Sequence, residues 1–114
     1  MRKTINQKIV SAVKTRAGDY CEICGKPALP SMALHHRKLK SRGGKDEVCN
    51  LLYLHHSCHN LATHSVHNNI TVATAKGWIV SSWDNPEEIP VVLAGGNVVM
   101  LLNNGETATV MEGD

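Results

Sequence analysis

The first segment with a clear hydrophobic pattern is residues 4–17, where apolar side chains recur every three to four positions. This spacing predicts an amphipathic helix. Thr4 and Gln7 have the spacing of a capping box at its start, and Gly18 is a natural stop. We expect the helix to cover one hydrophobic side of the core. Its basic residues, such as Arg16, fit either a phosphate contact or a solvated face equally well.

The middle of the chain reads as strand, loop, strand and helix. Residues 32–37 suit a short strand, 38–49 form a charged loop, and Leu51 to Leu54 suit a second strand. Ser57 can cap a helix that begins near Cys58. Because neighbouring side chains of a strand point to opposite faces, the adjacent histidines of the first strand must face different surroundings.

The C-terminal part has weaker signals. Residues 69–77 are either a helix between Asn69 and Gly77 or an extended segment, and residues 78–83 read as a strand. Two later turn signals, Gly95-Gly96-Asn97 and Asn103-Asn104-Gly105, separate apolar runs and predict a β meander. We expect an α+β fold, with one domain over 1–83 and a β-rich extension over 84–114 packed on it.

Composition limits the class of protein. A chain of 114 residues with four aromatic side chains forms one modest core, which a bound metal would help to hold together. No run of 18 apolar residues and no signal peptide is present, so the sequence predicts an intracellular protein without a membrane span. Eleven of the twelve Lys and Arg residues lie in residues 1–45, which favours a polyanionic partner for the front half. The acidic tail fits a protein partner or a weak dimer contact better than DNA.

Metal-ligand spacing is the strongest chemical signal. Cys21-x-x-Cys24 and His55-x-x-Cys58 form two knuckles of the kind that share one tetrahedral zinc, 30 residues apart. Two disulfides are the alternative, predicted only for a secreted peptide. The segment between the knuckles holds His35-His36, Gly43-Gly44 and Asn50, and His59 follows the last cysteine. All seven histidines lie in residues 34–67.

In this order, the stretches LHHR, SRGG and CNLLYLHHSCH resemble an HNH endonuclease of the ββα-metal type, in which a structural zinc clamps the hairpin and helix. They are most similar to small HNH proteins that bacteriophages encode beside DNA-packaging genes. The resemblance is strong over residues 18–67, weaker over 68–83 and absent beyond. It implies a ββα-metal core with a Cys₃His zinc site.

The resemblance also implies roles for individual residues. His35 would bind a catalytic ion and His36 would be the general base, while His59 would be the second ligand. Asn50 would bond across the loop and orient His36, or serve only as a buried structural residue. Because many relatives have Asp where this chain has His35, we expect tolerance of Mn²⁺, Ni²⁺ or Zn²⁺ as well as Mg²⁺.

The third ligand departs from the family pattern. Relatives often have a histidine four residues after the second ligand, but this chain has Thr63 there. His64 would point about 140° away on a regular helix, and His67 would lie about 12 Å along it. We favour His67, which requires the helix to break first, with His64 as the alternative.

Taken together, these features predict a metal-dependent HNH endonuclease that nicks or cuts DNA, leaving 5′-phosphate and 3′-hydroxyl ends. The resemblance suggests phage origin, action in the host cytoplasm and a partnership with terminase. The rival is a zinc-stabilised nucleic-acid-binding module without catalysis. The sequence predicts phosphate contacts from the basic residues that flank the site, namely Arg37, Lys38, Lys40, Arg42 and Lys45.

Overall fold

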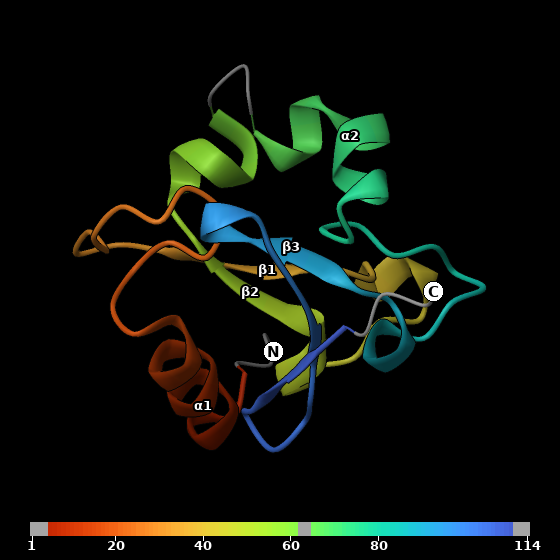
Figure 1. Cartoon of the computed structure of the whole chain (residues 1–114), viewed down its shortest axis with the longest axis horizontal. Coiled ribbons are helices and arrows are strands. Elements are labelled where there is room, and N and C mark those ends of the chain that lie inside the picture. Colours follow the sequence, from red (N-terminus) through yellow and green to blue (C-terminus); the bar gives the residue numbers. More distant parts are fainter. Residues whose placement is uncertain (1–4, 62–64, 111–114) are drawn as a thin grey trace.

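A computed structural model of the chain describes residues 5–61 and 65–110. It contains a β hairpin, a three-stranded sheet, two α-helices and several single-turn helical segments (Figure 1). The α+β class predicted from the sequence is confirmed. No helix of the described residues is long and apolar enough to cross a membrane. The main elements are α1 (Gln7–Ala17), β1 (Ala33–His36), β2 (Leu51–Leu54), α2 (Ile70–Ala75), β3 (Val91–Leu93), β4 (Asn97–Leu101) and β5 (Thr107–Thr109).

Helix α1 begins later than the sequence suggested. Asn6 is its N-cap, and the Asn6 side chain accepts a hydrogen bond from the Lys8 backbone N–H at 2.8 Å. Thr4, and with it the predicted Thr4–Gln7 capping box, lies outside the described residues. The helix ends as expected at Gly18, which adopts the left-handed conformation. In Figure 1, α1 lies on one side of the hairpin, and its buried residue Val13 packs in a cluster with β2.

Strands β1 and β2 pair in antiparallel fashion, with His35 opposite Leu52 and His36 opposite Leu51. All four β2 residues are buried, whereas burial alternates along β1. The two adjacent histidines therefore face opposite sides, as predicted: His35 is 1% exposed and His36 is partly exposed.

The segment after the hairpin contains one correct prediction and one wrong one. Residues 70–75 form helix α2, so the helical alternative for this stretch is confirmed. Residues 78–83 are not a strand. Three consecutive side chains there, Trp78, Ile79 and Val80, are buried together, and the Trp78 indole N–H donates to the Val92 carbonyl at 2.7 Å. Packing and hydrogen bonds to other parts of the fold hold this segment, and it does not pair with a strand.

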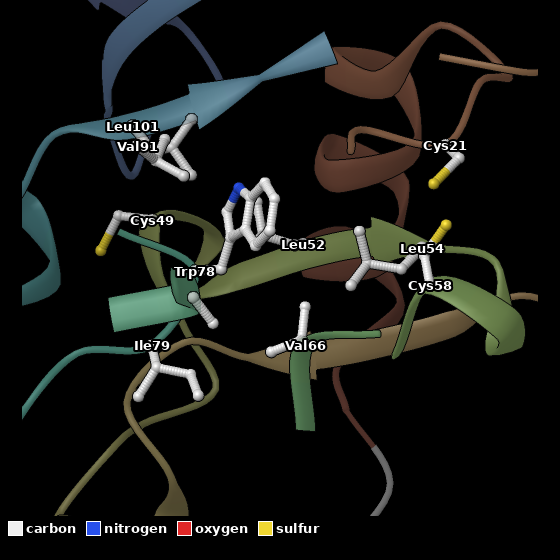
Figure 2. Packing of buried hydrophobic residues seen from close by; sticks show 11 residues of the cluster. Cys21, Cys49, Leu52, Leu54, Cys58, Val66, Trp78, Ile79, Val91 and Leu101 are labelled. Carbon is white, nitrogen blue, oxygen red and sulfur yellow. The ribbon is translucent and has the colours of Figure 1, made fainter. Parts of the chain in front are cut away.

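The C-terminal strands form the predicted meander, in the order β3, β4, β5. Gly95 and Gly96 have φ values of 81° and 79°, a backbone region open mainly to glycine, and they make the turn between β3 and β4. The sheet belongs to the main core, because Val91 and Leu101 pack in one cluster with Leu52, Leu54 and Trp78. Figure 2 shows the Trp78 ring in the middle of that cluster and two cysteines, Cys21 and Cys58, at its edge.

Candidate functional site

A cluster of three cysteines and one histidine lies at the edge of the core. Cys21 and Cys24 come from the turn after α1, and His55 and Cys58 come from the end of β2 and the short helical segment Ser57–Leu61. The candidate ligand atoms of all four lie within 4.8 Å of one another. In Figure 2 the sulfur atoms of Cys21 and Cys58 point toward one another. The two knuckles predicted from the sequence therefore converge on one point.

The donor set of this cluster fits zinc. The Nε2 of His55 is 2.8 Å from the Pro27 carbonyl, so Nε2 carries the proton and Nδ1, 3.2 Å from the Cys24 sulfur, presents its lone pair to the thiols. Burial and the adjacent Cys21 raise the pKa of Cys58 to about 12. Thiols this close cannot all ionise unless a cation compensates their charge. Cys₃His is an established structural zinc set, and the geometry supports it here.

A second cluster contains three histidines from three elements. His35 comes from β1, His59 from Ser57–Leu61 and His67 from the short helical segment Val66–Asn68. Their candidate ligand atoms lie within 4.8 Å of one another, and the Nε2 atoms of His59 and His67 are 3.0 Å apart. The three ring centroids are 4.6 to 5.2 Å apart.

His35 shows which ring atoms face the centre of this histidine cluster. Its Nε2 is 2.6 Å from the Trp78 carbonyl and must donate to it. Its Nδ1 is buried and has no hydrogen-bond partner within the described part of the chain. Burial lowers the pKa of His35 to about 3, so its imidazole is neutral and Nδ1 carries a free lone pair. An orphaned buried nitrogen beside two other imidazoles fits a divalent cation.

The helical segment that carries His59 does not continue to His67, as expected for a shared ion, because the Ser65 backbone is extended. Ser57–Leu61 and Val66–Asn68 are separate segments, and the Asn68 side-chain amide donates to the Asn60 carbonyl at 3.3 Å between them. His64, the alternative ligand, and Thr63 lie outside the described residues.

His36, on the other face of β1, contacts a carboxylate that sequence reasoning missed. Its Nε2 is 2.7 Å from Oδ1 of Asp46, whose Oδ2 accepts from Lys40 at 3.2 Å. The hydrogen bond from His36, with a smaller effect of Lys40, lowers the pKa of Asp46. The sequence places Asp46 in the loop between the glycine pair and Asn50, but this position does not give its partner.

Asn50 is fully buried and bonds across the loop as expected. It accepts from the Lys38 backbone N–H at 2.7 Å and donates to the Lys38 and Lys45 carbonyls at 3.0 Å each. It does not bond to the His36 ring, whose partner is Asp46. Asn50 therefore fixes the shape of the loop, and the expectation that it would orient His36 directly is wrong.

The prediction that Arg37 contacts DNA is also wrong. Its side chain is 0% exposed and donates to the carbonyls of Gly77, Cys49, Pro86 and Ile89. The reason is strand alternation. Side chains two positions apart face the same side of a strand, so Arg37 faces the interior as His35 does. The remaining predicted phosphate contacts are exposed or partly exposed along the loop, namely Lys38, Lys40, Arg42 and Lys45.

Several other candidate residues have structural partners. Arg16 forms a buried ion pair with Glu22 at 2.7 Å, so it is neither a phosphate contact nor a solvated residue. All four cysteines are free thiols, which argues against the disulfide alternative. Cys49 is buried outside the zinc cluster, and His56 is exposed, with its Nε2 2.9 Å from the Ser31 hydroxyl.

Comparison with known proteins agrees with this geometry. Residues 21–65 match the family model of the HNH endonucleases. This part of the chain is therefore similar to the HNH endonucleases. The match begins at the first zinc knuckle and includes the hairpin, the loop and His59. No curated protein and no solved structure matches the chain. Similarity to this family over residues 21–65 indicates a nuclease or nucleic-acid-binding function, and HNH nucleases use divalent metals.

Proposed function

We propose that the protein is a metal-dependent endonuclease that hydrolyses DNA phosphodiester bonds. The observation that carries this proposal is the histidine cluster of His35, His59 and His67, with the orphaned Nδ1 of His35 facing two further imidazoles. A purely structural role would not require a buried nitrogen without a partner. A bound divalent ion would stabilise negative charge on the scissile phosphate and the leaving 3′ oxygen.

In this proposal His36 is the general base. The carboxylate of Asp46 accepts a hydrogen bond from the Nε2–H of His36, which leaves the Nδ1 lone pair to take a proton from the attacking water. Asn50 holds the loop that carries Asp46 through its bonds to Lys38 and Lys45. His35 and His36 thus place an ion ligand and a base at consecutive positions of one strand.

The loop supplies the remaining parts of the site. Lys38, Lys40, Arg42 and Lys45 would contact the phosphate backbone, which positions DNA without reading its sequence. Three imidazole ligands suit Mn²⁺, Ni²⁺ or Zn²⁺ better than Mg²⁺, which prefers oxygen ligands. The Cys₃His cluster would hold a separate structural zinc. A phage origin, with intracellular action beside terminase in DNA packaging, rests on the sequence resemblance.

Nicking of supercoiled plasmid tests the proposal, with Mg²⁺, Mn²⁺ or Ni²⁺ supplied separately. We expect His36→Ala to keep its fold and DNA binding but to lose at least about a hundredfold in cutting rate, the contribution usual for a general base. His56→Ala is the matched control, because this exposed histidine lies outside both clusters, and it should cut like the wild type.

Two results would contradict the proposal. Equal cutting by His36→Ala and the wild type would remove His36 as the base. DNA binding by the wild type without cutting in any of the three ions would favour the rival, a non-catalytic nucleic-acid-binding module.

A further inference from the structure

A cleft of about 310 Å³ lies next to the proposed catalytic loop. One wall comes from that loop and the other from residues 83–87, which lie outside the segment matched by the HNH family model. Its most unusual feature is Trp83, whose side chain is 94% exposed. Such exposure gives the fold almost none of the burial energy that a large aromatic ring can provide.

The turn that carries Trp83 is fixed relative to the proposed base. The Lys38 ammonium donates to the Asp84 carbonyl at 3.0 Å, and the buried Arg37 donates to the Pro86 carbonyl at 3.0 Å. Arg37 and Lys38 are the two residues that follow His36. These hydrogen bonds connect both walls of the cleft to the end of β1, and they hold the indole close to the catalytic loop.

Some charged groups of the cleft already have hydrogen-bond partners in the protein, and others do not. Each of the three carboxylates has a donor within the protein: the Cys49 thiol for Glu47, the Ser81 hydroxyl for Asp84 and the Asn103 amide for Glu87. In contrast, the Lys45 ammonium forms no ion pair or hydrogen bond within the described residues. The groups free to meet a ligand are an aromatic face, the ammonium of Lys45 and the backbone of Gly43-Gly44.

An exposed aromatic face beside an unengaged cation is a combination that binds single nucleic-acid strands, because bases stack on the ring while the cation holds a phosphate. A protein partner would instead need apolar surface around the tryptophan. The cleft offers little, because Pro86 is its only other non-glycine apolar residue and is buried.

We propose that Trp83 and the cleft between residues 38–47 and 83–87 bind an unpaired nucleotide of the DNA strand beside the cutting site. The base stacks on Trp83, and Lys45 contacts its phosphate. This inference rests on the proposed nuclease function and extends it, because it predicts a preference for DNA that is single-stranded or locally opened next to the scissile bond.

Tryptophan fluorescence provides a direct test, because the chain has only two tryptophans. Trp78 is 9% exposed, so acrylamide quenching reports mainly on Trp83. The sample is the zinc-loaded full chain carrying His36→Ala, titrated with a single-stranded oligonucleotide and with its duplex. We expect saturating oligonucleotide to protect the exposed tryptophan from acrylamide, more strongly for the single strand. In a Trp83→Phe background, no DNA-dependent change should remain.

Affinity measurements complete the test. Trp83→Ala should weaken oligonucleotide binding about fivefold to a hundredfold, the range that loss of one base–aromatic stack produces, whereas Trp83→Phe should retain most of the affinity. Lys45→Ala should also weaken binding, while the control Lys26→Ala, an exposed lysine outside the cleft, should not. Leu29→Ala controls for loss of an exposed apolar side chain, since Leu29 is 60% exposed and does not line the cleft.

Unchanged acrylamide quenching at saturating DNA, or wild-type affinity for Trp83→Ala, would overturn this inference and leave Trp83 as a contact for another protein. Either result is separable from failure of the nuclease proposal. If the wild type does not nick plasmid in any ion but DNA still protects Trp83, the nucleotide site stands and the catalytic assignment falls.

Discussion

Three consecutive residues at the end of β1 point in alternate directions and meet different chemistry. His35 faces the buried histidine cluster, His36 faces Asp46 at the surface, and Arg37 returns to the interior. Burial lowers the pKa of Arg37 to about 10, yet the guanidinium remains charged at neutral pH and satisfies four backbone carbonyls. Arg37 therefore connects the hairpin to the irregular segments around Gly77 and Pro86.

Replacing Arg37 with Met should lower the free energy of unfolding by roughly 3 to 5 kcal/mol, because four backbone carbonyls would lose the hydrogen bonds that Arg37 donates. Arg42→Met is the matched control. This arginine is exposed in the same loop, and its loss should cost less than about 0.5 kcal/mol. Urea unfolding in the presence of zinc measures both variants. Equal stability of the two would show that the Arg37 contacts contribute nothing to folding.

The sequence located site residues correctly where a local pattern of residues determines their position. Ligand spacing located Cys21, Cys24, His55 and Cys58, which the structure brings together. It failed for Arg37 because a basic residue beside a predicted nuclease site looked like a DNA contact, although strand alternation already placed it on the inward face. Asp46 was missed because its partner depends on how the loop folds back, and no local pattern gives that path.

At the scale of elements, the site depends on a hairpin followed by short helical segments. The strands were predictable as short runs, 32–37 and 51–54, on either side of a charged loop that contains Gly43-Gly44. The irregular segment Trp78–Val80 could not be predicted from a local pattern, because its side chains are buried by packing against β3 and by contact with Arg37. The Cys₃His cluster brings the turn after α1 to the end of β2, so an ion bound there would fix the base of the hairpin.

The zinc cluster can be tested with the two kinds of cysteine in the chain. We expect Cys24→Ser to lose one zinc ion per chain and to lower Tm by roughly 10 °C or more, because even about 2 to 3 kcal/mol shifts Tm that far in a domain of this size. Cys49→Ser is the control, since this cysteine is outside the cluster, and it should keep the zinc. Elemental analysis and thermal unfolding provide the readouts. Zinc loss from Cys49→Ser alone would contradict the assignment.

At the scale of the whole molecule, the C-terminal sheet and the zinc cluster share one core. Val91 and Leu101 pack in the same cluster as Cys21 and Cys58, and Trp78 lies between them (Figure 2). This packing supports our proposal that residues 84–114 are an extension of the domain formed by 1–83.

The central claim is that the chain holds two ions with different roles, one that stabilises the fold and one that takes part in catalysis. Anomalous diffraction from crystals of the zinc-loaded protein soaked in Mn²⁺ tests it most directly. We predict a zinc peak bonded to Cys21, Cys24, His55 and Cys58, and a separate manganese peak within bonding distance of His35 Nδ1 and of Nε2 of His59 and His67. A zinc peak alone, with the three imidazoles bound to no ion, would contradict the account.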